Sequence, residues 1–370
     1  MKERLEAYGW NERWKRKFDE LLEGRTTAAV PLEPARVAAQ HGHLYRVVVK
    51  GGNLSGEVSG RFAFDAAGPG DFPAVGDWVA VSRLAGEDKV VIHAVLPRVS
   101  AFRRKAAGPE AKEQLIAANV DTLWIVMALN DDFNMSKLER YLIAAWESGA
   151  APEVVLTKAD LCEDPERRAA SVIAAAPGVP VHVVSAPLGL GREELAAALR
   201  PERTLAVTGS SGVGKSTILN WLAGMDLQRT HEIRESDDRG KHTTTHRELF
   251  ALPGGALLID TPGMRELALW DAGDGWRETF ADIEELAADC RFRDCRHMSE
   301  AGCAVLAAVA AGELDARRLG NYRKTGRELA YQERKEQSAR GKLLTKSRQA
   351  KASHAADRRA GRKAAVAEEE

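Results

Sequence analysis

The chain has 370 residues, of which 44% are hydrophobic and 29% are charged, and its formal net charge is −1. This length predicts two or three domains, each large enough to bury a core. The longest mainly apolar run, residues 120–129, is much shorter than the roughly 20 residues of a membrane span, and the N-terminus lacks the apolar core of a signal peptide. The sequence therefore predicts a cytoplasmic protein without a membrane partner, and we expect a monomer.

Residues 1–40 are expected to form an N-terminal arm and residues 41–100 a small β-barrel. In the second segment, short β-prone runs alternate with clusters of glycine, proline and aspartate. About five short strands in a segment of this length are typical of an OB-fold, although an SH3-like barrel would give nearly the same pattern. The runs that predict strands include Tyr45–Val49, Arg61–Phe64, Trp78–Val81 and Val90–Val95.

Residues 101–275 are expected to form an α/β domain that follows a basic spacer at residues 103–105. Short apolar runs alternate there with segments of helical spacing, the first at Lys137–Ser148. Continuous apolar runs indicate strands that are buried on both faces, and hence a parallel sheet covered by helices. The predicted strands are Val120–Ala128, Val154–Leu156, Val181–Val184, Leu205–Val207 and Ala256–Ile259.

A phosphate-binding loop is predicted within this domain, where the sequence matches G-x-x-x-x-G-K-[ST] between a strand and a helix. Its glycines allow backbone N–H groups to face phosphates, and the N-terminus of the helix favours their charge. Lys215 is expected to neutralise the β- and γ-phosphates in catalysis, and Ser216 to bind Mg²⁺. The predicted nucleotide-binding residues here are Gly209, Ser210, Ser211, Gly212, Val213, Gly214, Lys215, Ser216 and Thr217.

Two segments after the loop are predicted to sense the γ-phosphate. Asp260-Thr-Pro-Gly263 follows an apolar strand and is expected to be switch II, with Asp260 reaching Mg²⁺ through water and the Gly263 N–H contacting the phosphate. The long polar stretch at residues 228–247 is expected to be switch I. Thr243 or Thr244 would give it a hydroxyl ligand for Mg²⁺.

The residue after the switch II glycine is Met264. Many GTPases carry a glutamine at this position, which orients the attacking water, and a thioether cannot replace it. We therefore expect slow intrinsic hydrolysis that depends on a partner or on another side chain. His242 is the preferred catalytic candidate and His246 the second, while the alternative is that both histidines are structural or contact the partner.

The element that reads the base is predicted at Thr157-Lys-Ala-Asp160, after a strand. Asp160 can accept hydrogen bonds from guanine N1–H and the 2-amino group, a pair that adenine does not present, and Lys158 would lie along the base plane. Thr157 stands where asparagine is commoner, so we expect slightly weaker binding of the base. Ser185-Ala186, after the next strand, resembles the element that backs the base. An ATPase is the alternative interpretation.

These motifs occur in a permuted order, because both base-binding elements precede the phosphate loop and the two switches. The usual GTPase set is therefore cut after switch II and rejoined elsewhere. Its parts can still meet in space, since the packing of a sheet does not depend on where the chain begins. The cut places the C-terminal segment directly after switch II, where a module can respond to the γ-phosphate.

Residues 276–332 are expected to form an α-helical zinc-binding domain. Its cysteines and histidine follow the pattern Cys290-x4-Cys295-x-His297-x5-Cys303. Three thiolates and one imidazole complete a tetrahedral Zn²⁺ site that contributes to folding and leaves no open position for catalysis. A cluster of reduced cysteines without metal is the alternative.

The segment that follows, residues 333–370, is expected to be a basic and partly disordered tail. Residues 321–363 hold 14 Lys/Arg against 4 Asp/Glu. Such a charge excess on an acidic body indicates contact with a polyanion, nucleic acid before membrane. A solvated basic helix is the alternative.

With these residues the chain resembles the RsgA family, also called YjeQ, of circularly permuted GTPases. The resemblance covers about residues 40–330 and rests chiefly on the permuted order combined with the zinc pattern. It implies an N-terminal OB-fold, a central GTPase that binds GTP or GDP with Mg²⁺, and a zinc domain. It also implies that the small (30S) ribosomal subunit and its 16S rRNA are the partners, that the subunit stimulates hydrolysis, and that the protein acts in late 30S maturation. Release on hydrolysis is expected, and an RNA-binding regulator that uses its nucleotide site only as a switch is the alternative.

Overall fold

The computed structural model describes residues 4–23, 30–105, 113–224, 247–260, 273–335 and 338. The chain divides into two units, Met1–Glu313 and Leu314–Glu370. The first unit contains a barrel, a mixed α/β domain and a short helical region with the predicted metal ligands. In the second unit, residues 316–335 form one helix.

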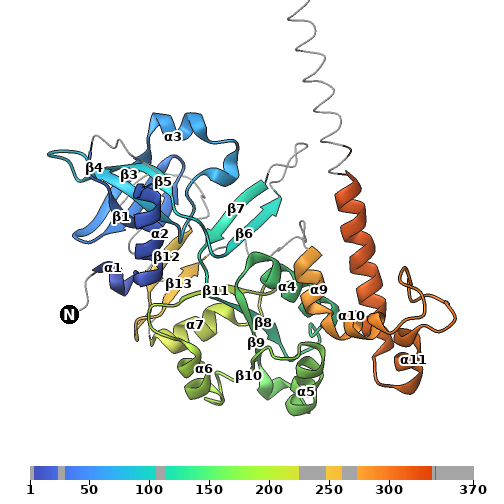
Figure 1. Cartoon of the computed structure of the whole chain (residues 1–370). Coiled ribbons are helices and arrows are strands. Elements are labelled where there is room, and N and C mark those ends of the chain that lie inside the picture. The colour runs from blue at the N-terminus through green and yellow to red at the C-terminus, as the bar shows by residue number, and fades with distance from the viewer. Residues whose placement is uncertain are drawn as a thin grey trace, which may run out of the picture. The chain divides into compact units, whose positions relative to one another are not determined.

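The N-terminal barrel is closed by five strands (Figure 1). They are β1 (Glu33–His41), β2 (Leu44–Val49), β3 (Gly52–Val58), β4 (Trp78–Arg83) and β5 (Lys89–Val95). β1 pairs with β2, β2 with β3, β3 in parallel with β5, β5 with β4, and β4 again with β1. This order, with its one parallel pair and its closure through β1, is that of an OB-fold and confirms the predicted barrel.

Two parts of the barrel differ from the sequence expectation. The barrel begins with β1 at Glu33, inside the stretch expected to be the arm. The sequence pattern missed this strand because alanines, rather than large β-branched residues, fill much of its buried face. The strand predicted at Arg61–Phe64 is wrong, since this segment lies in helix α3 (Gly60–Asp65). The Ser59 hydroxyl caps that helix by accepting the Phe62 N–H at 3.1 Å, a signal that a strand pattern does not include.

The arm contains two helices whose aromatic side chains pack on the barrel. They are α1 (Arg4–Ala7) and α2 (Glu12–Glu23). Trp14 and Phe18 are buried in one cluster with Trp78 of β4, and the Trp14 and Trp78 ring centroids are 5.9 Å apart. The arm therefore adds apolar area to a barrel too small to bury much surface alone.

The α/β domain is built on a sheet in the order β10-β9-β8-β11-β13-β12. Every neighbouring pair is parallel except β12 with β13. This arrangement confirms the predicted parallel sheet. The strands are β8 (Thr122–Ala128), β9 (Ala151–Thr157), β10 (Val181–Val183), β11 (Thr204–Thr208), β12 (Glu248–Ala251) and β13 (Leu257–Asp260).

Helices cover both faces of this sheet (Figure 1). On one face, Leu142 of α4 (Met135–Ser148) packs in a cluster with Ile125 and Val154. On the other face, Ile218 of α7 (Lys215–Ala223) packs in a second cluster with Trp124. The alternation of the strand residues between two cores explains their continuous apolar pattern. The covering helices are α4 (Met135–Ser148) and α5 (Pro165–Ala175) on the first face, and α6 (Arg192–Ala198) and α7 (Lys215–Ala223) on the second.

The basic spacer predicted between barrel and sheet is instead one strand of a hairpin. It consists of β6 (Ala101–Lys105) and β7 (Glu113–Ala118), which pair antiparallel. Phe102 and Ile116 are buried in the same core as α4. The hairpin was hidden because charged residues interrupt its apolar positions.

A buried arginine joins the arm, the barrel and the sheet. The Arg36 guanidinium donates to the Tyr8 carbonyl, to the Asn119 carbonyl at 3.4 Å and to the Thr204 hydroxyl at 2.7 Å, and lies over the Trp78 ring. Burial lowers the pKa of Arg36 to about 10, and nearby Asp121 and Asp77 act in the opposite direction. The group therefore keeps its charge at neutral pH.

After the sheet, the described residues of the first unit form three further helices with a loop. They are α9 (Gly273–Thr279), α10 (Ala281–Ala288) and α11 (Ala304–Ala311). The Gly275 N–H donates to the Glu147 carboxylate of α4 at 3.1 Å, and a Cβ on Gly275 would meet the Ile143 carbonyl at 2.3 Å. Glycine therefore allows α9 to lie directly against α4. Within the described residues, we find no helix with the length and hydropathy that crossing a membrane requires.

Gly76 should be the least replaceable glycine at the barrel–sheet junction. Its φ is +93°, and a Cβ there would lie 2.1 Å from the Ala118 carbonyl oxygen. We expect Gly76→Ala to lower the free energy of unfolding by roughly 3 kcal/mol, from backbone strain and this clash together. Gly86 has φ +79° with no atom near a Cβ, so Gly86→Ala should cost only about 1 kcal/mol. Equal losses in urea unfolding would contradict this account.

Candidate nucleotide site and metal centre

The predicted phosphate loop connects β11 to α7 and adopts a conformation that its glycines permit. Gly209, Gly212 and Gly214 have φ angles of +143°, +75° and +98°. A Cβ on Gly209 would lie 2.3 Å from the Val126 carbonyl oxygen of β8. The loop is therefore seated closely on the neighbouring strand, which only glycine allows at this point.

The loop ends at the N-terminus of α7, where the predicted catalytic lysine is the first helical residue. The Lys215 ammonium donates to the carbonyl oxygens of Gly209 at 2.8 Å and Ser210 at 2.5 Å, so it lies across its own loop. Ser216 and Thr217 follow in the first turn and are exposed. Together, the ammonium, the two hydroxyls and the positive end of the helix dipole can bind a phosphate chain and a Mg²⁺ ion.

Thr157 connects the predicted base-reading element to the phosphate loop. This residue ends β9, its side chain is buried, and its hydroxyl donates to the Val213 carbonyl at 2.6 Å, with the Met127 carbonyl also within 3.2 Å. From the sequence we expected only weaker binding of the base, because threonine lacks the amide of asparagine. The structure shows that the threonine hydroxyl still reaches the phosphate loop.

Asp160 and Ser185 of the predicted base-binding elements are joined by a hydrogen bond. The Ser185 hydroxyl is buried and donates to one carboxylate oxygen of Asp160 at 2.5 Å. The Asp160 side chain is exposed, and Ala186 follows Ser185 directly. Lys158 lies in the left-handed region at φ +56°, which turns the chain sharply after β9. A fixed, exposed carboxylate is what recognition of adjacent guanine N–H donors requires.

The remaining predicted γ-phosphate residues are placed only in part. Asp260 ends β13, which runs parallel to β11 in a register that pairs Ala206 with Ile259. The backbone at Asp260 is therefore at the same edge of the sheet as the phosphate loop. His242, Thr243, Thr244, Gly263 and Met264 lie outside the described residues.

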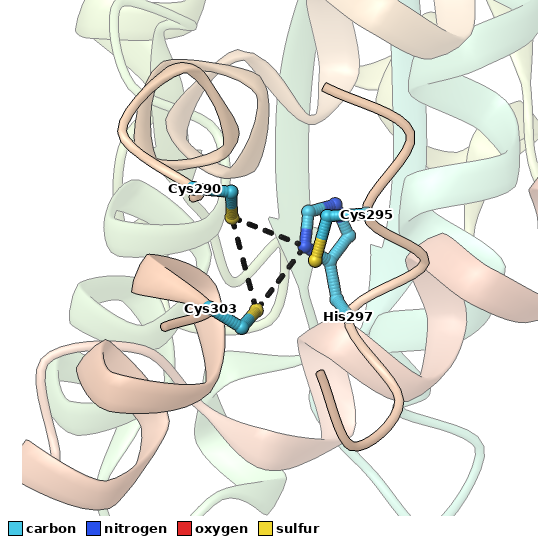
Figure 2. A group of neighbouring side chains, drawn as sticks. All are labelled: Cys290, Cys295, His297 and Cys303. Carbon is cyan, nitrogen blue, oxygen red and sulfur yellow. Dashed lines mark hydrogen bonds between the residues drawn. The ribbon is translucent and has the colours of Figure 1, made fainter. Parts of the chain in front are cut away.

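The predicted metal ligands converge on one point (Figure 2). Their ligand atoms all lie within 4.8 Å of one another. The Cys290 and Cys303 sulfurs are 3.8 Å apart, and the His297 Nδ1 lies 3.6 Å from the first and 3.4 Å from the second. With Zn–S bonds of about 2.3 Å and Zn–N of about 2.0 Å, a tetrahedral ion needs separations of about 3.5–3.8 Å. The spacing thus fits zinc, with Cys295 as the fourth ligand.

Glu300, which the sequence pattern treated as a spacer residue, organises the loop between the ligands. Its carboxylate accepts N–H groups from Arg296 at 3.0 Å, Met298 at 2.7 Å and Ser299 at 3.0 Å. Backbone hydrogen bonds, with those from Glu300 itself and Ser299 the largest contributions, lower the pKa of Glu300 to about 2. The sequence signal for this role would have been an acidic residue three positions after the ligand histidine.

Thr157→Val should weaken nucleotide binding. The substitution keeps the side-chain shape but removes the donor to the Val213 carbonyl, and an unpaired buried carbonyl costs about 1–3 kcal/mol. We expect the affinity for GDP, measured by calorimetry, to fall about tenfold. Thr157→Ser keeps the hydroxyl and should bind almost as the unchanged protein does. If both variants bind GDP equally, the hydroxyl does not organise the site.

Metal analysis should detect about one zinc ion per chain, since the four ligands form a closed set. Cys303→Ser should lose this zinc, whereas Cys162→Ser should keep it, because Cys162 lies outside the cluster. Removal of zinc by a chelator should speed hydrogen exchange in peptides covering residues 290–303, because binding energy of such sites is folding energy. A zinc content unaffected by Cys303→Ser would contradict the assignment.

Comparison with known proteins places this arrangement in one family. A sequence model of the RsgA GTPase family matches residues 95–270. The "Small ribosomal subunit biogenesis GTPase RsgA 2" of Lactiplantibacillus plantarum is 48% identical over 80% of this chain and 83% of its own length. A Listeria innocua protein, "Small ribosomal subunit biogenesis GTPase RsgA 1", is 45% identical over 90% of this chain and 92% of its own.

A solved structure agrees with the sequence relatives. The crystal structure of YjeQ from Thermotoga maritima superposes with a TM-score of 0.61 at 26% identity, over 81% of this chain and 99% of that one. The chain thus has a closed barrel, a permuted sheet and a Cys/His cluster, and it shares 45–48% sequence identity with these relatives. The chain belongs to the RsgA GTPase family and is a GTP hydrolase.

Proposed function

We propose that this GTPase binds the small (30S) ribosomal subunit in the cytoplasm, contacts its 16S rRNA, and acts late in its maturation. The observation that carries the proposal is the 45–48% identity, over most of the chain, to relatives named as small ribosomal subunit biogenesis GTPases. The barrel agrees with it, because OB-folds bind oligonucleotides on their strand faces. The charge excess of residues 321–363 would strengthen binding to RNA.

The nucleotide would be held by the loop Gly209–Thr217, with its base against Asp160 and Ser185. Lys215 would neutralise phosphate charge, while the Thr157 hydroxyl would hold the base-reading strand against the loop. Mg²⁺ would be bound by Ser216 and by Thr243 or Thr244, and would supply charge neutralisation at the phosphates. Gly263 would sense the γ-phosphate, and His242 is the candidate for orienting the attacking water.

Because Met264 occupies the position where many GTPases carry glutamine, we expect intrinsic GTP hydrolysis to be slow until the partner binds. In this proposal the subunit completes the site, hydrolysis is accelerated, and loss of the γ-phosphate releases the protein. This cycle would act as a checkpoint, because release would require a subunit that can trigger hydrolysis. We expect the protein to act as a monomer.

The proposal predicts selective stimulation by one subunit. Isolated small subunits should raise the turnover of GTP at least about tenfold, whereas large subunits should not, because only the correct partner completes the water-positioning site. The turnover is measured as the rate of phosphate release with either small or large subunits added alone. Lys215→Ala should hydrolyse little GTP with or without subunits.

Two results would overturn the assignment. One is equal stimulation by both subunits, or none by either. The other is normal binding and release of the small subunit by Lys215→Ala, measured by sedimentation in GTP, which would indicate an RNA-binding regulator whose cycle does not need hydrolysis.

A further inference from the structure

Both predicted switch segments adjoin the same end of one strand pair. β12 begins at Glu248, immediately after the segment expected to be switch I, and β13 ends at Asp260, the first residue of switch II. Glu248 and Asp260 are register partners across the antiparallel β12–β13 pair. A displacement of β12 at Glu248 would therefore be transmitted to the ends of both switches.

The barrel contacts β12 at this same residue. Ala39 of β1 is the register partner of Glu248 on one side and of Arg46 of β2 on the other. Arg46, Ala39, Glu248 and Asp260 therefore form one row across four strands, two from the barrel and two from the GTPase sheet. Residues paired in this way share one face of a sheet, so the side chains of Arg46, Ala39 and Glu248 lie on the same face.

An ion pair spans this row. The Arg46 guanidinium contacts the Glu248 carboxylate, and it can extend across Ala39 because that residue carries only a methyl group. The Glu248 side chain is 16% exposed and that of Arg46 36%. Partial burial reduces screening by solvent, so this pair has more energetic weight than an ordinary surface pair.

The surroundings give this contact room to change. The ion pair borders a cavity of about 280 Å³ whose lining includes Arg4, Asn53 and Phe250. The adjacent Arg247 is held separately, because its guanidinium donates to the Leu115 carbonyl of β7 at 3.0 Å. The end of the predicted switch I is thus contacted by groups outside the GTPase sheet, and the cavity leaves space beside one of these contacts.

We infer that the Arg46–Glu248 ion pair couples the barrel to the switches, so that binding of a partner to the barrel sets the rate of GTP hydrolysis. This inference rests on the proposed function, because the partner it requires is the small ribosomal subunit. Arg46 and Glu248 are positioning residues and do not touch the nucleotide. Coupling through such a contact is a free energy shared between two sites.

The test compares stimulated turnover with binding. In Arg46→Ala, turnover at saturating small subunits should fall about tenfold, within the usual range of coupling between sites. Basal turnover should change less than about twofold, because neither residue touches the nucleotide, and saturating subunits remove any contribution of Arg46 to binding. Glu248→Gln, which keeps the side-chain shape, should behave in the same way.

Three further variants separate coupling from general stability. Arg83→Ala removes a barrel ion pair to Glu33 that does not reach the GTPase sheet, and it should leave stimulation unchanged. Arg46→Lys should keep part of the stimulation. The exchange Arg46→Glu with Glu248→Arg re-forms the ion pair with its charges reversed, and it should restore most of the stimulation that either single change loses.

The outcomes distinguish this inference from the proposed function. If the unchanged protein is not stimulated by small subunits, the proposed function fails. If it is stimulated and Arg46→Ala is stimulated equally, the coupling is overturned. The coupling is also overturned if Arg46→Ala reaches full turnover once enough subunits are added, because the pair would then contribute only to binding.

Discussion

The carboxyl ends of parallel strands lie at the same side of a sheet, and every described part of the predicted nucleotide site follows such a strand end. β9 leads into Thr157 and Asp160, β11 leads into the phosphate loop, and β13 ends at Asp260. The order of these strands along the chain is permuted, yet their order in the sheet brings them together. Thr157 then converts proximity into a fixed geometry by bonding one element to the next.

The barrel lies beside the part of the GTPase sheet that adjoins both predicted switches. Of the two strands between the predicted switches, β12 lies at the edge of the GTPase sheet, where an unpaired strand would be a template for aggregation. Here the barrel strand β1 lies beside it and pairs at Glu248. The N-terminal domain thus covers the edge of the GTPase sheet that adjoins both predicted switches, so the barrel and these segments share one continuous sheet.

The sequence predicted the elements with strong local signals. Strands rich in valine, leucine and isoleucine, the glycines of the phosphate loop and the Cys/His spacing each follow from short-range chemistry. β1 and the β6–β7 hairpin were missed because alanines and charged residues weaken the alternation on which strand prediction depends. The contacts of Thr157 with Val213 and of Arg46 with Glu248 join residues far apart in the chain, so no local pattern could indicate them.

The candidate metal ligands lie in a region whose apolar core is small. α11 has the sequence AVLAAVAA, and only Val305 and Ala308 in it are buried. Side chains of this size supply little burial energy, and short segments of this kind depend on a metal or disulfide for stability. Four ligands from the end of α10, the following loop and the start of α11 would supply that stability when zinc is bound. α9 and α10 precede this region in the chain, and α9 is held against α4 through Gly275 and Glu147, so stability supplied at the metal ligands would extend to the helices that join this region to the GTPase domain.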